Sequence, residues 1–274
     1  MIHFDYGTQL SPYPIKLSIG HLKKPLLSEI ANPEKGMSFE RFNYYEVMLQ
    51  LTPELFFTKF CGENGKALWN NLSDEEKEKL TLYELIINDK TLIETFTEIF
   101  NFFFIEEVVF YEGFFILLHK DITFNPETLE KDDFDLVSEN IFKDVLNAIQ
   151  QVCCLNVKEE EEIQDKYKNK LAQKLHEKIL KAEKEKKQKA AENSDLSIPN
   201  IISAVSNKHP TLSPISIWDL TIFQLLDSFN RLKINNYFDL NTTRVSVWGD
   251  EKSTYNAALW YKNIYDKNEN NKEE

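Results

Sequence analysis

The chain has 274 residues, of which only 7 are glycine and 9 are proline. Turns between many short strands and loops that bind phosphate both need these residues, so the composition disfavours an all-β sandwich and glycine-lined phosphate sites and predicts a mainly helical protein. The 45 acidic residues outnumber the 32 basic ones, for a net charge of −13, which disfavours non-specific nucleic-acid binding and favours a basic protein partner.

The length allows one large domain or two of ordinary size, at about 150 residues per domain. A hydrophobic fraction of 42%, with 20 Phe, 11 Tyr and 4 Trp, is sufficient for at least one large core and excludes global disorder. Cys61, Cys153 and Cys154 fit neither a disulfide framework nor the ligand spacing of a zinc site, so we expect a reducing compartment.

The sequence shows neither a secretory signal nor a membrane span. No basic start followed by an apolar run is present at the N-terminus. The most apolar stretch, Phe102 to Leu118, contains Glu106, Glu107 and Glu112, and each such charge costs several kcal/mol in hydrocarbon. We therefore expect a soluble, intracellular protein.

The first predicted element, from Ile2 to Ile19, is a strand or an extended arm, because Pro12 and Pro14 disfavour an early helix. Apolar residues at steps of three and four predict an amphipathic helix over Ser38 to Leu51. We expect this helix to end at Pro53.

Two capping boxes, Ser73 to Glu76 and Thr81 to Glu84, predict two further helix starts. Leu92 to Phe104 is predicted as a buried helix. Its five phenylalanines are expected in the core, where each buried ring contributes about 2 to 3 kcal/mol to stability: Phe96, Phe100, Phe102, Phe103 and Phe104.

A small hairpin is predicted between Ile105 and Leu118, because β-branched and aromatic residues flank the turn sequence Glu112-Gly113. From Phe134 the apolar residues recur at helical spacing. This pattern predicts a helix from Phe134 to about Cys153.

The segment from Lys158 to Glu192 is strongly charged. Its acids lie at the front and most of its lysines toward the back, which matches the dipole of one long helix. The acids between its lysines disfavour nucleic-acid binding. Apolar residues at four-residue steps form a narrow stripe that suits a surface or a partner helix rather than a core: Ile163, Tyr167, Leu171, Leu175 and Ile179.

A second ordered region follows this segment. It begins with a short helix after Ser197 and continues with the clearest amphipathic helix of the chain, Ser216 to Leu232. Aromatic residues near the end are expected to tie the tail back before a disordered end from Asp266. Four rings suit either core packing or an exposed docking surface: Trp218, Trp248, Trp260 and Tyr261.

These patterns predict a mainly α fold with a minor β component, formed by the N-terminal extended arm and the short hairpin. The helices are expected to form a bundle with one long charged helix. The predicted organisation is an N-terminal, mostly helical domain at 1–156, a charged helix or linker at 157–193, a C-terminal helical region at 194–266 and a disordered tail at 267–274.

Catalytic and metal-binding signatures are absent from the sequence. No Walker-type phosphate-binding motif occurs, and the five histidines are scattered singly. The triplet His119-Lys120-Asp121 lacks a Ser or Cys nucleophile at a recognisable elbow, so a solvated strand end is favoured over an active site. We expect no enzymatic activity, no cofactor and no metal.

Six segments near the two ends of the chain carry recurrent patterns of packing residues: Tyr13 to Ile30, Phe39 to Glu54, Ser197 to Pro210, Ser216 to Leu232, Val245 to Gly249 and Leu259 to Tyr265. In these segments the chain resembles tail assembly chaperone-like proteins from phages of low-GC Gram-positive bacteria, which are encoded near the tape measure protein. The shared patterns concern packing and not catalysis.

The resemblance implies a non-enzymatic chaperone that covers the apolar stripes of the helical tape measure protein during tail morphogenesis. It would act in the host cell cytoplasm, be absent from the mature virion, and bind neither membrane nor nucleic acid; a homo-oligomer stays open. The alternative is a structural tail or baseplate protein, or an adaptor, of the virion. The expected contact residues are Trp218, Phe223, Phe229, Trp248, Trp260 and Tyr261, with a second surface at Tyr167, Leu171 and Leu175.

Overall fold

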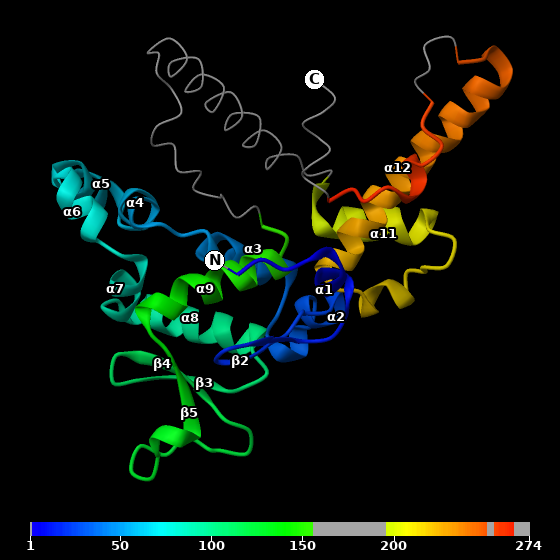
Figure 1. Ribbon diagram of the computed structural model, residues 1–274. Coiled ribbons are helices and arrows are strands. Elements are labelled where there is room, and N and C mark those ends of the chain that lie inside the picture. Colours follow the sequence, from blue (N-terminus) through cyan, green and yellow to red (C-terminus); the bar gives the residue numbers. More distant parts are fainter. Residues whose placement is uncertain (1, 156–195, 251–254, 266–274) are drawn as a thin grey trace. The chain divides into compact units, whose positions relative to one another are not determined.

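The computed structural model describes residues 2–155, 196–250 and 255–265 (Figure 1). The chain divides into two compact units, Met1–Val157 and Lys158–Glu274. The predicted charged helix at 157–193 and the tail at 267–274 lie outside the described residues. A mainly α fold with a minor β component is consistent with the structure, but the predicted helical bundle is wrong.

The described elements are taken in chain order. In the first unit, the α-helices are α1 (Tyr6–Leu10), α2 (Leu27–Ile30), α3 (Phe39–Leu49), α4 (Pro53–Leu55), α5 (Gly62–Asn71), α6 (Asp74–Lys79), α7 (Leu82–Ile87), α8 (Lys90–Phe103) and α9 (Glu139–Val152). The strands are β1 (Ile15–Leu17), β2 (Gly20–Leu22), β3 (Val108–Tyr111), β4 (Phe114–Leu118) and β5 (Phe134–Val137). Shorter turns of helix are η1 (Pro33–Lys35), η2 (Phe56–Phe60) and η3 (Lys131–Asp133). In the second unit, the elements are α11 (Ile198–Lys208), η5 (Ser216–Asp219), α12 (Ile222–Trp248) and η6 (Leu259–Tyr261).

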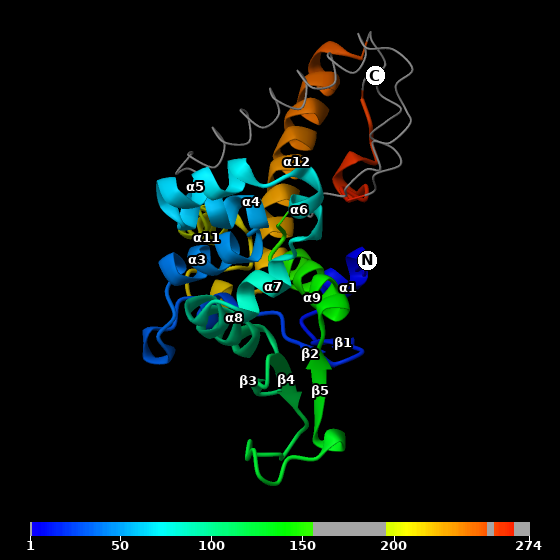
Figure 2. The ribbon, with the colours of Figure 1, turned by 90° about the vertical axis from the view of Figure 1, so that its left-hand side faces the viewer.

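The first unit is built from helices packed against a sheet, which is why the bundle prediction fails. Helix α8 lies against α7 and β3, and α9 lies against α3, α7 and β5. Strands β3, β4 and β5 form one antiparallel sheet in that order. The sheet lies on one side of α8 and α9, and α4 to α6 lie on the other (Figures 1 and 2).

Strand β5 replaces the first turn of a predicted helix. Residues 134–137 pair with β4, with Leu118 opposite Phe134 and Phe115 opposite Val137. Helix α9 then begins at Glu139 and ends at Val152. The apolar residues of the strand had the right spacing for a helix, but pairing with a strand distant in sequence determines their conformation.

The N-terminal segment is less extended than predicted. Asp5 caps the short helix α1, because its side chain accepts the backbone N–H of Thr8 at 2.8 Å. The helix ends before Pro12, so proline limits its length without preventing it. Strands β1 and β2 form a hairpin, and Leu22 of β2 makes a bridge to Phe104.

Residues at the very start of the chain contact the end of the first unit. The backbone N–H of Phe4 donates to Oε1 of Gln151 at 2.9 Å, and Nε2 of Gln151 donates to the carbonyl of Ile2 at 2.7 Å. Nε2 of Gln9 donates to the carbonyl of Gln151 at 3.3 Å. One glutamine of α9 therefore binds both the residues before α1 and a residue of α1 itself.

Several local predictions are confirmed. Both capping boxes are present, at Ser73 for α6 and at Thr81 for α7. The predicted hairpin is formed by β3 and β4 with Tyr111 opposite Phe114. Its two turn residues, Glu112 and Gly113, have φ of 48° and 86°, as a type I′ turn requires.

Phenylalanine rings form the core of the first unit. The ring centroids of Phe100 and Phe115 are 5.1 Å apart, and those of Phe96 and Phe142 are 5.9 Å apart, so α8 contacts both the sheet and α9 through aromatic pairs. Burial of each ring contributes about 1.5 to 3 kcal/mol. Of the predicted core residues, only Phe102 is half-buried. The ammonium of Lys23 lies 5.2 Å from its ring centroid.

The second unit contains a longer helix than predicted. Helix α12 has 27 residues and begins after Thr221, whose capping box with Gln224 replaces the expected start at Ser216. It continues past Leu232 to Trp248 and ends at Gly249, which has a φ of 77°. Helix α11 packs against α12. Within the described ranges, the apolar character of the helices falls short of what a bilayer crossing needs.

Candidate functional site

Three of the predicted contact residues are buried or half-buried in the second unit. Phe223 is buried, with its ring centroid 5.2 Å from that of Tyr265. Phe229 is half-buried, and the Nζ atom of Lys233 lies 5.1 Å from its ring centroid. Trp218 is half-buried, and its indole N–H donates to the carbonyl of Pro214 at 2.9 Å.

The other three predicted contact residues of this unit are exposed. Trp248 has 75% of its surface exposed, Tyr261 has 63% and Trp260 has 53%. Trp260 and Tyr261 contact each other edge to face at 5.1 Å. Trp248 lies in the last turn of α12, where its exposure contradicts the predicted role as an anchor for the tail. The predicted second surface, Tyr167, Leu171 and Leu175, lies outside the described residues.

Residues 255–265 pack against one side of α12. The rings of Phe238 and Tyr255 are 6.0 Å apart, and the Tyr255 hydroxyl lies 3.2 Å from that of Thr242. Nη1 of Arg231 donates to the carbonyl of Lys262 at 2.7 Å. Each helical residue advances about 100° around the axis, so Arg231, Phe238 and Thr242 share one face.

The opposite side of α12 carries a row of exposed residues, which we call the α12 stripe. Its positions follow one another at steps of four, three, four and three, and therefore share one face: Lys233, Tyr237, Leu240, Arg244 and Val247. Leu240 is 72% exposed, Val247 is 64% and Tyr237 is 59%. Trp248 adjoins the stripe. A row of exposed large apolar side chains on one helix face is a candidate binding surface.

The sequence contains a signal for the α12 stripe beyond Leu232, the predicted end of this helix. Between Leu232 and Gly249 there is no proline or glycine, so neither of the two strongest helix breakers interrupts the pattern. The alternation of four-residue and three-residue steps also continues past Leu232. Both features favour a longer helix and place Leu240 on the same face as Tyr237.

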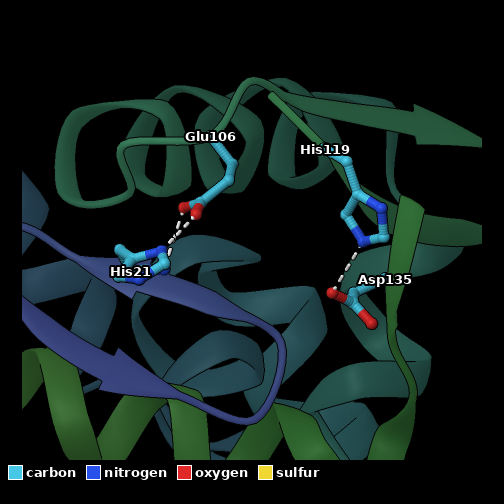
Figure 3. Close-up of polar contacts among 4 residues, drawn as sticks. All are labelled: His21, Glu106, His119 and Asp135. Atoms are coloured by element: carbon cyan, nitrogen blue, oxygen red, sulfur yellow. Dashed lines mark hydrogen bonds and ion pairs between the residues drawn. The ribbon is translucent and has the colours of Figure 1, made fainter. Parts of the chain in front are cut away.

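A second candidate is a cavity of about 340 Å³ in the first unit. It lies beside the end of β4 and the segment between α8 and β3. The lining residues are His21, Ile105, Glu106, Glu107, Leu118, His119, Lys120, Asp121 and Ile122. Two histidine–carboxylate pairs border it (Figure 3).

Glu106 joins the β1–β2 hairpin to the segment before β3. Its Oε2 accepts the backbone N–H of His21 at 2.9 Å, and its Oε1 lies 2.7 Å from Nδ1 of the same residue. Burial raises the pKa of Glu106, but the hydrogen bonds from His21 outweigh it, so the net pKa is lowered. A Cβ at Gly20 would lie 2.9 Å from Oε2, and the φ of 148° at this position also favours glycine.

The second pair joins His119 of the cavity to Asp135 of β5, with Nε2 of His119 3.1 Å from Oδ2 of Asp135 (Figure 3). Each imidazole is turned toward its own carboxylate. The lining residues include no Ser, Thr or Cys that could act as a nucleophile. In the described ranges, no three His, Cys, Asp or Glu side chains are placed to bind a metal ion. The first pair joins β2 to the segment before β3, and the second joins the end of β4 to β5.

Comparison with known proteins points to the second unit. Residues 185–265 match the family model described as the YomV second domain, and YomV is a Bacillus phage-region protein. Comparisons with curated proteins and with solved structures found no match. The matched range includes α11, α12 and η6, and therefore the α12 stripe. Residues 185–265 are thus similar to a phage-associated domain.

Proposed function

We propose that this chain is a non-enzymatic phage protein that binds another phage protein through the exposed side of α12. The observation that carries the proposal is the α12 stripe, an exposed apolar row within the range that matches a phage-associated domain. Residues 255–265 pack on the opposite side of the helix, so they leave the stripe accessible. Trp248 extends the apolar surface at the end of the helix.

The proposed partner is the tape measure protein, with the chain acting as a tail assembly chaperone in the host cell cytoplasm. The resemblance of both ends of the sequence to tail assembly chaperone-like proteins supports this partner. A long helical chain with apolar stripes aggregates unless a protein covers them before the tail tube encloses it. Many copies along one filament make a modest affinity per site sufficient.

Co-expression with the tape measure protein of the same phage tests the proposal. We expect the full-length chain to keep the tape measure protein in the soluble fraction and to co-purify with it. Leu240→Asp places a charge in the middle of the stripe, and we expect it to reduce the co-purified amount by about tenfold or more. Ile215→Asp is the matched control, because Ile215 is exposed in the same unit but lies outside α12.

Two results would contradict the proposal. One is recovery of the tape measure protein that is equal for the wild type and Leu240→Asp. The other comes from mass spectrometry of purified virions: a chaperone leaves the particle, so stoichiometric amounts of this chain in virions would favour a structural tail or baseplate protein instead.

A further inference from the structure

Resting on the proposed function, we infer that the α12 stripe binds an amphipathic partner helix whose apolar side is flanked by Asp or Glu. The inference comes from the spacing and the charge of the stripe. It specifies the chemistry of the bound segment, which the proposed function leaves open.

The spacing of the stripe fits a helix as the bound element. Steps of four, three, four and three residues are those by which one helix meets another at a shallow crossing angle. From Lys233 to Val247 the stripe rises by about 21 Å, at about 1.5 Å per residue, so it contacts about four turns of a partner helix. Leu240 and its neighbours Tyr237 and Val247 supply the apolar contacts along this length.

The charge of the stripe is opposite to that of the chain. The protein carries a net charge of −13, yet two of the five stripe positions, Lys233 and Arg244, are basic and exposed. Asp239 is the only acidic residue between Lys233 and Trp248, and it lies about 100° around the helix from Leu240. Carboxylates beside the apolar residues of a partner helix would therefore meet cations at the first and fourth positions of the stripe.

A single-stranded nucleic acid fits the stripe less well. Such a ligand needs a continuous basic track with aromatic rings for its bases. The middle of the stripe is aliphatic at Leu240, and its two cations lie eleven positions apart in the sequence, at 233 and 244. The partner helix is therefore the occupant that the residues favour.

Two labelled peptides of about 18 residues test the inference by fluorescence anisotropy with the full-length protein. Both have leucines at alternating three-residue and four-residue steps; one has Glu at the flanking positions and the other has Lys. At low salt we expect the Glu-flanked peptide to bind about tenfold more tightly than the Lys-flanked peptide, and the difference to shrink at high salt. The double variant Lys233→Glu, Arg244→Glu should reverse the preference.

Lys208→Glu is the matched control, because Lys208 is an exposed lysine of α11 that lies outside the stripe, and this variant should keep the preference. Equal binding of the two peptides, or an unchanged preference in the double variant, would overturn the inference. The inference would also be overturned if a single-stranded oligothymidylate bound as tightly as the Glu-flanked peptide and Leu240→Asp abolished that binding.

Failure of the inference differs from failure of the proposed function. If the peptide preference is absent while the tape measure protein still co-purifies in a manner sensitive to Leu240→Asp, the function stands and the partner chemistry is wrong. If the preference is present but no phage protein co-purifies, the stripe binds as inferred and the proposed function is wrong.

Discussion

At the scale of single residues, Glu46 of α3 carries the clearest consequence for stability. It lies near Cys153 and Cys154 at the end of α9, and burial raises its pKa to about 7. A carboxylate that loses its water without gaining an opposite charge is unfavourable in the folded state. Folding therefore favours the protonated form of this side chain.

We predict that Glu46→Gln stabilises the protein at pH 8 and reduces the pH dependence of its unfolding. Because the pKa is higher in the folded state than its ordinary value of 4.5, the folded state retains a proton that the unfolded state releases. Stability should therefore fall as pH rises from about 4.5 to about 7 and then level off. The gain in the free energy of unfolding at pH 8 should be on the order of 1 to 3 kcal/mol.

Urea unfolding at pH 5 and pH 8 measures this effect. Glu40→Gln, at an exposed position of the same helix, is the control and should change the free energy of unfolding little at either pH. An equal change for Glu46→Gln at both pH values would show that burial does not control the titration of this group.

At the scale of elements, structure set by neighbouring residues could be predicted and structure set by distant contacts could not. The capping boxes at Ser73 and Thr81 and the hairpin turn at Glu112 depend on a few adjacent residues, and all are present. Strand β5 depends on pairing with β4, which periodicity does not reveal. The helical spacing of its apolar residues therefore led to the wrong element.

The candidate site shows the same limit. Trp248, Trp260 and Tyr261 could be predicted as rings that suit either core or surface, and all are exposed. The sequence pattern does not separate them from Phe223, which is buried, because exposure depends on how residues 255–265 pack against α12. Leu240 was missed because the helix was expected to end at Leu232.

Gly65 of α5 provides a test at this scale. Helix α5 packs closely against η2, and a Cβ at Gly65 would lie 2.5 Å from the carbonyl oxygen of Phe57 and closer still to Cys61. Backbone atoms cannot move aside as a flexible side chain can. We predict that Gly65→Ala lowers the free energy of unfolding by about 2 kcal/mol or more.

The stacked pair Phe57 and Trp69, with ring centroids 5.7 Å apart, offers a local measurement for this variant. With Trp218, Trp248 and Trp260 replaced by Phe, so that Trp69 alone reports, tryptophan fluorescence during urea unfolding should show the loss at lower denaturant concentration. Asn64→Ala, at an exposed neighbouring position in α5, should leave the midpoint unchanged or raise it. Equal midpoints for the wild type and Gly65→Ala would mean that η2 and α5 can separate at no cost.

At the scale of the whole molecule, charge predicts which partners the chain avoids. With 45 acidic and 32 basic residues, the molecule repels a phosphate backbone, and the basic pair of the α12 stripe is too small to offset this. We predict no binding of a duplex DNA of about 30 base pairs at about 150 mM salt, measured by anisotropy. Saturable binding under these conditions would show that the net charge does not prevent the chain from binding a phosphate backbone.

The contacts of Gln151 can form only late in the synthesis of the protein. A ribosome releases Ile2 and Phe4 well before it makes α9, so these residues have no partner until most of the first unit has emerged. These two hydrogen bonds join residues from opposite ends of the sequence of this unit, so they form late in folding. Synthesis that stalls before Gln151 leaves Ile2 and Phe4 without these hydrogen bonds and more open to proteases.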